Sequence, residues 1–177
     1  MGELTVYVEE YASANKSERA FDTNLWALNV LPLLVRIENN GRDSYAIKVQ
    51  EISLRRETSL SAMTPAETAS KAAREGIAQA VGWSLIVPIV SIPVAAGLSA
   101  MNTGSVNTEL AQDFNRKGLK EGPLKQGEHR TGFLFYQLEE GTKTLSGLTL
   151  ELKLGQLVTK EETVIAIPLP EITIDTK

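Results

Sequence analysis

The chain has 177 residues, of which 42% are hydrophobic and 23% charged, which suits one globular domain and excludes a disordered tail or a protein with many membrane spans. The net charge of -4 argues against the phosphate backbone of nucleic acid as the main partner. Cysteine is absent and histidine occurs once, which excludes disulfides, Cys/His zinc sites and cysteine nucleophiles, so we predict no metal and no cofactor.

The first residues lead directly into an alternating stretch, without the basic and apolar segments of a signal peptide. Two explanations stay open, a cytoplasmic protein or a sequence from which a leader has been trimmed.

The first half of the chain is predicted to form strands. Apolar residues alternate over 4–8, 26–30 and 33–37, which is the period of a strand with one buried face. Asn39-Asn40-Gly41 follows, and because these residue types tolerate positive φ, we predict a hairpin there.

The returning strand of that hairpin changes its parity. Its apolar residues take odd positions and then even ones: Tyr45, Ile47, Val49, Ile52 and Leu54. A slip of one residue turns every later side chain to the other face. We therefore predict a β-bulge at Gln50-Glu51, with Val49 and Ile52 both buried.

A helical insertion is predicted over residues 64–118. Thr64-Pro65-Ala66-Glu67 combines an N-cap residue, a proline at the first helical position and a glutamate three residues after the cap. Small residues then recur at helical spacing, which suits close packing against another backbone: Ala66, Ala69, Ala73, Gly76 and Ala80. A second helix is predicted after Thr108, with Leu110 and Phe114 on its buried face and Gly118 beyond its end.

The centre of the insertion is uncharged from Gly76 to Thr108, and residues 83–98 are apolar apart from two serines. Its large apolar residues are the candidate interaction surface: Trp83, Leu85, Ile86, Ile89, Val90, Ile92 and Leu98. Residues 77–101 are long enough to span a membrane. However, Pro88 and Pro93 would each cost about 3 kcal/mol inside a helix, which favours a broken helical hairpin. Packing on its own domain or on a sister subunit, contact with a membrane, and a true span all stay open.

Strands return in the last third of the chain, over 131–138, 148–154 and 164–169. About seven strands interrupted once by helices predict a mainly β fold, an antiparallel sandwich with a helical insertion in a single domain over 1–177. Gly132 and Gly147 beside these strands indicate bulges or close backbone approach.

No catalytic constellation is predicted. His129 lies between Glu128 and Arg130 and is interpreted as a surface residue. The adjacent carboxylates at 9–10, 139–140 and 161–162 point to opposite faces of a strand, which makes them poor acid–base pairs. Trp26 is interpreted as a core residue.

Two stretches carry a family resemblance. Residues 31–41 (LPLLVRIENNG) with Tyr45, and 119–128 (LKEGPLKQGE) with 132–136 (GFLFY), are similar to a pattern in candidate bacterial lipoproteins of unknown function. The resemblance implies an Ig-like β-sandwich with a Gly/Ala-rich insertion, anchored through a lipidated N-terminal cysteine. This sequence contains no cysteine, so the anchor is implied by the resemblance alone, and the family brings no catalytic residues.

We therefore expect a non-enzymatic, extracytoplasmic binding or scaffolding module of a bacterium that presents an apolar helical insertion to a membrane or to other subunits. A cytoplasmic location stays open, and a protein partner, if there is one, is unidentified. The alternative is a soluble accessory domain that binds an apolar small ligand, and an enzyme of unknown type is the third reading.

Overall fold

The computed structural model describes residues 3–73 and 110–173, and these contain nine strands. In chain order the elements are β1 (Leu4–Glu10), α1 (Ala14–Phe21), the 3-10 helix η1 (Trp26–Leu28), β2 (Val30–Asn39), β3 (Tyr45–Ile47), the 3-10 helix η2 (Val49–Glu51), β4 (Ile52–Arg55), β5 (Ser59–Ser61), β6 (Gly122–Leu124), β7 (His129–Gln137), β8 (Thr149–Gln156) and β9 (Glu162–Pro168). Residues 65–73 and 110–117 are also helical. The chain divides into two compact units, 1–63 with 117–177, and 64–116.

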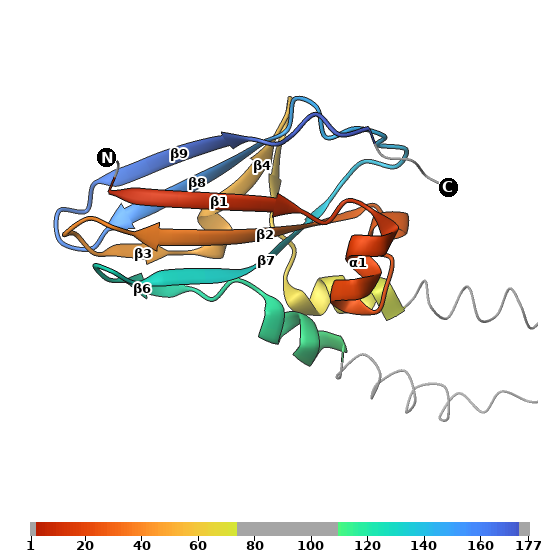
Figure 1. Ribbon diagram of the computed structural model, residues 1–177, viewed down its shortest axis with the longest axis horizontal. Helices are drawn as coiled ribbons and strands as arrows, with labels where there is room; N and C mark the ends of the chain where they lie inside the picture. Colours follow the sequence, from red (N-terminus) through yellow and green to blue (C-terminus); the bar gives the residue numbers. More distant parts are fainter. Residues whose placement is uncertain (1–2, 74–109, 174–177) are drawn as a thin grey trace, which may run out of the picture. The chain divides into compact units, whose positions relative to one another are not determined.

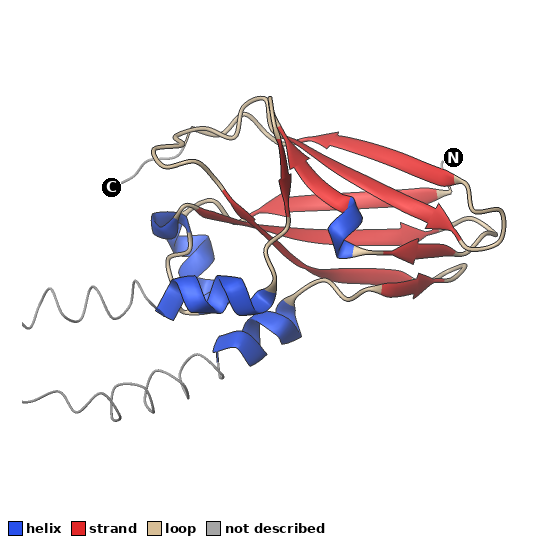
Figure 2. Cartoon of the chain, turned by 180° about the vertical axis from the view of Figure 1, so that it is seen from behind, coloured by secondary structure: helices blue, strands red, loops and turns tan. Residues whose placement is uncertain are grey.

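The first unit is a β-sandwich built from two antiparallel sheets (Figures 1 and 2). One sheet has the order β1-β2-β7, and the other has the order β5-β4-β8-β3-β6 with β9 on the opposite side of β8. The inward-facing residues of β2 and β8 are fully buried in one core: Leu33, Val35, Ile37, Leu150, Leu152 and Leu154. Burying each such side chain stabilises the folded state by about 1.5–3 kcal/mol. The predicted sandwich with a helical insertion is confirmed.

A second apolar layer covers the outer face of the β1-β2-β7 sheet. Phe133 and Phe135 alternate along β7 with core residues, so they point outward. Their rings lie 4.7 and 5.5 Å from the ring of Phe21 at the end of α1, in edge-to-face geometry. The helix α1 therefore shields this face of the sheet from water.

The hairpin predicted at Asn39-Asn40-Gly41 is wrong. β2 is flanked by β1 and β7, and β3 pairs with β6 and β8 in the other sheet. The turn carries the chain from one sheet to the other, and neither Asn40 nor Gly41 has a positive φ. Gly41 is required for space instead, because a Cβ on it would lie 2.6 Å from the Cβ of Glu3.

The buried side chain of Asn39 holds this turn. Its amide donates to the carbonyls of Asp43 and Leu124, at 2.6 and 3.2 Å, and its side-chain oxygen accepts the N–H of Gly41 at 3.1 Å. A buried polar side chain must be satisfied in this way to avoid a desolvation penalty. The asparagine therefore joins both sheets rather than closing a hairpin.

The irregularity predicted at Gln50-Glu51 is confirmed, but the device is a single 3-10 turn, η2, rather than a one-residue bulge. β3 pairs with β8 through Ala46 and Gly155, and β4 pairs with the same strand from Ile52 onward. The turn moves the buried set from odd to even positions. Ile52 is fully buried as predicted, whereas Val49 is only half-buried against the core.

The strand predicted over 26–30 is also wrong, because residues 26–28 form the 3-10 turn η1. The side chain of Asn24 accepts the N–H of Ala27, and Asn29 ends the turn in the left-handed region at φ 55°. Asparagine tolerates this conformation, whereas a strand cannot contain it. Trp26 is nevertheless a core residue, as predicted.

The chain leaves the sandwich before the second unit and returns after it at neighbouring points on β7. The N–H of Met63 donates to the carbonyl of Phe135 at 2.7 Å, and the N–H of Leu119 donates to that of Phe133 at 2.9 Å. Gly132 makes the second contact possible, because a Cβ on it would lie 2.4 Å from the Cα of Leu119. The close backbone approach predicted at Gly132 is confirmed.

Candidate functional site

The first helix of the second unit begins with a complete capping box, as the sequence predicts. The hydroxyl of Thr64 accepts the N–H of Glu67 at 3.2 Å, and the carboxylate of Glu67 accepts the N–H of Thr64 at 2.7 Å. Pro65 occupies the first helical position, where its missing N–H costs nothing. The start of the insertion is therefore set by local chemistry.

Removing this cap should weaken the second unit. We expect Thr64→Ala to lower the free energy of unfolding by about 0.5–2 kcal/mol, because the N–H of Glu67 loses its acceptor and the Glu67 carboxylate loses the hydroxyl that donates to it. Urea titration followed by circular dichroism at 222 nm measures the change. Thr58→Ala, at an exposed position of the first unit, is the control and should change little. Equal effects of the two substitutions would contradict a specific role for the cap.

The capping box also predicts a dependence on pH. The bonds from the N–H and hydroxyl of Thr64 to the Glu67 carboxylate lower the pKa of Glu67 from its usual value. A carboxyl whose pKa is lower in the folded state stabilises the fold above the unfolded-state pKa of about 4.3, and that contribution is lost as pH falls through the folded pKa. Thermal unfolding of Glu67→Gln should therefore depend less on pH below 4.3 than that of the parent. Identical dependence of thermal unfolding on pH in the variant and the parent would contradict this role of the Glu67 carboxylate.

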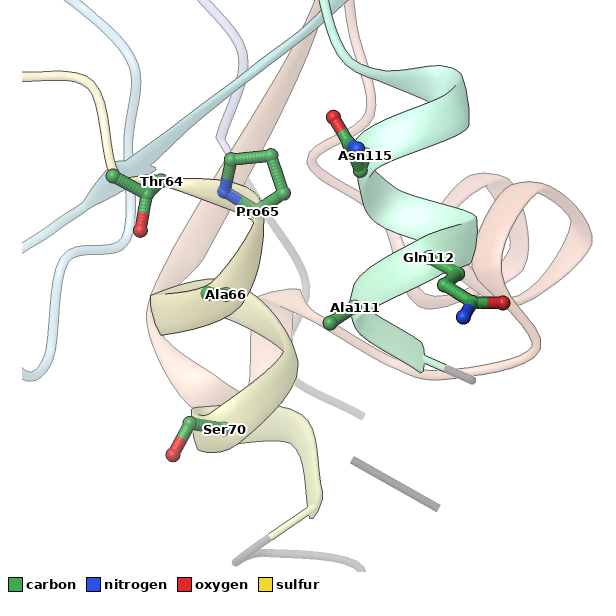
Figure 3. Close-up of a pocket in the computed structure, with 7 residues that line it drawn as sticks. All are labelled: Thr64, Pro65, Ala66, Ser70, Ala111, Gln112 and Asn115. Carbon is green, nitrogen blue, oxygen red and sulfur yellow. The ribbon is translucent and has the colours of Figure 1, made fainter. Parts of the chain in front are cut away.

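A pocket of about 540 Å³ lies between the helical residues 65–73 and 110–116 of the second unit (Figure 3). The first helix and its cap contribute Thr64, Pro65, Ala66 and Ser70, and the second contributes Ala111, Gln112 and Asn115. Figure 3 shows Ala111 pointing toward the first helix and Gln112 pointing away from it. The mixture of small apolar side chains with a few hydroxyl and amide groups suits a largely apolar ligand.

The alanine face that the sequence predicts is only partly observed. Ala69 and Ala73 are buried, together with Thr68 and Ala72, whereas Ala66 is exposed. On the second helix Phe114 is buried as predicted, and Leu110 is half-buried. Gly76, Ala80 and Thr108 lie outside the described residues.

A second cavity, of about 230 Å³, lies in the first unit among the β4–β5 turn and the residues that follow β7. Arg56 lines it and donates to the carbonyls of Thr144 and Ser146, at 2.8 and 2.9 Å. Glu57 and Glu139 bring negative charge to the same cavity. Sequence reasoning missed this site because its residues come from loops that are far apart in the chain.

The residues of the candidate interaction surface, from Trp83 to Leu98, lie outside the described residues. His129 is exposed at the start of β7, in keeping with a surface role. The carboxylates of Glu9 and Glu10 both pair with Lys16, at 3.3 and 3.0 Å. Within residues 3–73 and 110–173, no cluster of side chains could hold a metal ion.

None of the helices in the described ranges combines the length and the apolar character needed to cross a membrane.

Comparison with known proteins identifies no matching family model and no matching curated protein. Among solved structures the chain is similar to ycdA, a candidate lipoprotein of Bacillus subtilis, at 12% identity and a TM-score of 0.46, over 96% of this chain and 36% of that one. It is also similar to the yjhA protein of Bacillus subtilis, at 17% identity and a TM-score of 0.40, over 82% and 72% of the two chains. A functionally unknown protein of Listeria monocytogenes matches at 12% identity and a TM-score of 0.36, over 80% and 58%.

The chain thus spans about a third of the length of ycdA. One neighbour belongs to the class that the sequence resemblance names, but every TM-score is below 0.5. These likenesses therefore assign no activity, ligand or partner to the chain.

Proposed function

We propose that this protein is a non-enzymatic binding or scaffolding module whose sandwich carries an apolar helical insertion that contacts a membrane or other copies of the chain. The observation behind this proposal is that the backbone N–H groups of Met63 and Leu119 both donate to carbonyls of β7 at neighbouring positions. Because the chain leaves and rejoins the sandwich at one strand, the two sheets are complete without residues 64–116. The insertion is therefore available for a task other than closing the sandwich core.

The sequence of the insertion supports the same proposal. Residues 83–98 are apolar apart from two serines, and no charge occurs from 76 to 108. An exposed stretch of this size would exceed the apolar patches of a few hundred Å² that monomeric proteins show. Its own domain, a second copy or lipid would therefore cover it. An extracytoplasmic location is proposed from the sequence resemblance alone.

The test is a paired substitution within the apolar stretch, Ile86→Asp with Ile89→Asp. We expect circular dichroism to show that the variant stays folded. It should lose either self-association, measured by size-exclusion chromatography, or binding to vesicles of phosphatidylethanolamine and phosphatidylglycerol, measured by flotation. The matched control is Leu157→Asp with Val158→Asp, which adds the same charge at exposed apolar positions of the sandwich. The control should behave as the parent.

Two outcomes would contradict this proposal. Unfolding of the Ile86→Asp, Ile89→Asp variant would place these residues in a core, because an unpaired buried charge is severely destabilising. A folded variant with unchanged association and vesicle binding would show that the insertion mediates neither self-association nor membrane binding.

A second candidate function, binding of an apolar small ligand, is favoured by the pocket between residues 65–73 and 110–116. An apolar fluorescent probe such as 1-anilinonaphthalene-8-sulfonate should bind the parent, and Ala111→Phe should weaken its binding by filling the pocket. Probe binding that is unchanged in Ala111→Phe would exclude this pocket as the site.

A further inference from the structure

The turn between β2 and β3 contains a reactive pair of residues. Asn40 is followed by Gly41, and it is the only asparagine of the sequence that precedes a glycine. An asparagine in this position can react with its own backbone, because glycine has no side chain to hinder the approach of its nitrogen. Asn40 is exposed and Gly41 is buried. The surroundings of the pair therefore decide whether it reacts.

The reaction is deamidation, which needs no cofactor. The backbone nitrogen of Gly41 loses its proton and attacks the side-chain carbonyl carbon of Asn40. A C–N bond forms and closes a succinimide ring, while the bond to the side-chain nitrogen breaks and that nitrogen takes up a proton and leaves as ammonia. Water then adds to one ring carbonyl and opens the ring, which leaves aspartate or isoaspartate at position 40. The Gly41 N–H must therefore be able to lose its proton, and the Asn40 side chain must be able to reach it.

The fold prevents the first of these steps. The N–H of Gly41 donates to the carbonyl of Glu3 at 3.0 Å and to the side-chain oxygen of Asn39 at 3.1 Å. A donor with two acceptors keeps its proton, because both acceptors stabilise the protonated amide. Asn39 is itself buried and is fixed by its bonds to the carbonyls of Asp43 and Leu124. The Gly41 nitrogen is therefore held in its unreactive form.

Residues 3–5 hold back the second step. The side-chain amide of Asn40 donates to the hydroxyl of Thr5 at 3.1 Å, and the backbone N–H of Asn40 donates to the carbonyl of Glu3 at 2.7 Å. The other sheet strengthens this hold, because the hydroxyl of Tyr45 donates to the Glu3 carboxylate at 2.9 Å. The Asn40 side chain is thus directed toward β1 instead of the Gly41 nitrogen.

We propose that Asn40 is a deamidation site that stays inactive while residues 3–5 are docked and reacts when they open together with the turn. The rate of reaction then follows the equilibrium population of the open form, because local opening and closing are fast beside a slow chemical step.

The modification makes the opening permanent. Loss of ammonia is a one-way step, so the asparagine does not form again. The isoaspartate product also lengthens the backbone by one carbon beside Gly41. This glycine has no spare room, because even a Cβ on it would lie 2.6 Å from the Cβ of Glu3. Residues 3–5 therefore lose the surface on which they dock.

Incubation at mildly alkaline pH followed by tryptic digestion tests the proposal. Cleavage after Arg36 and Arg42 releases residues 37–42. Tandem mass spectrometry of this peptide measures the conversion of amide to acid at position 40 and distinguishes aspartate from isoaspartate. We expect the folded parent to react at least about tenfold more slowly than the chain unfolded in guanidinium chloride, because several hydrogen bonds must break before the reaction.

Two conservative substitutions loosen the hold without changing the reacting atoms. Thr5→Val removes the acceptor of the Asn40 side chain, and Tyr45→Phe removes the hydroxyl that holds Glu3. Each should speed deamidation of the folded protein about twofold to tenfold, which corresponds to the loss of one hydrogen bond. Thr131→Val, at an exposed position of β7, is the matched control and should react as the parent. All four chains should react equally fast when unfolded.

Hydrogen exchange supplies a second measurement. The amide of Gly41 should exchange slowly in the folded parent and faster in Thr5→Val. Equal deamidation of the folded and unfolded parent, no conversion at position 40 in the unfolded chain, or fast exchange of the Gly41 amide in the folded parent would overturn the proposal. Rates that neither Thr5→Val nor Tyr45→Phe changes would overturn it as well.

Discussion

Replacing Gly132 with Ala is expected to lower the free energy of unfolding by about 2–4 kcal/mol, through overpacking and loss of one backbone hydrogen bond. The added Cβ would lie 2.4 Å from the Cα and 2.5 Å from the backbone nitrogen of Leu119. Backbone atoms cannot turn aside as a flexible side chain can, so the segment at Leu119 must move away from β7. The bond from its N–H to the carbonyl of Phe133 would then be lost.

Gly155→Ala is the matched control for this prediction. Gly155 also lies in a strand of the first unit, but a Cβ on it would meet no atom within 4 Å. We expect this substitution to change stability by less than about 1 kcal/mol, because only the freedom of the unfolded chain is reduced. Urea denaturation followed by tryptophan fluorescence compares the two variants. Equal stability of Gly132→Ala and Gly155→Ala would contradict the close approach of Leu119 to β7.

Truncating Leu152 to Ala should cost about 2–5 kcal/mol, because the lost burial is joined by a cavity that the surroundings fill only in part. Leu152 is fully buried at the centre of β8, between Ile52 on β4 and Ile165 on β9. The substitution thus affects three strands at once. Chemical denaturation monitored by far-UV circular dichroism gives the change in the free energy of unfolding.

The neighbouring Lys153→Ala provides the comparison for Leu152. Lys153 follows Leu152 on the same strand, but its side chain points to the exposed face. We expect a change within about 0.5 kcal/mol. A cost below about 1 kcal/mol for Leu152→Ala would show that the centre of the sandwich is not packed as the register of β8 requires.

Several features of this protein were predictable from the sequence because they depend on neighbouring residues. The alternation over 33–37 and 148–154 corresponds to β2 and β8, since successive side chains of a strand point to opposite faces. The helix start at Thr64 was predictable from hydrogen bonds that span three residues. The shift of apolar residues from odd to even positions before Ile52 indicated an interruption of the strand. A 3-10 turn and a bulge produce the same shift, so the sequence did not distinguish them.

Some local signals existed but were missed. Ser13 caps α1 through the N–H of Lys16, and Asp22 ends this helix in the left-handed region. The helix is only eight residues long and lies between strands, so its capping residues carry little weight beside the strand-like pattern around it. Asn24 and Asn29 mark η1 in the same way, whereas the alternation of Trp26 and Leu28 suggested a strand.

Other features were decided only by the tertiary structure. The turn at Asn39–Gly41 looks like a hairpin locally, but β2 already has a partner on each side, so the chain must cross to the other sheet. The pocket between 65–73 and 110–116 likewise depends on which distant segments come together. Strand periodicity and helix caps are interactions within a few residues and can be predicted from sequence. Strand partners and edges depend on competition among all segments for the same core, which a local pattern does not contain.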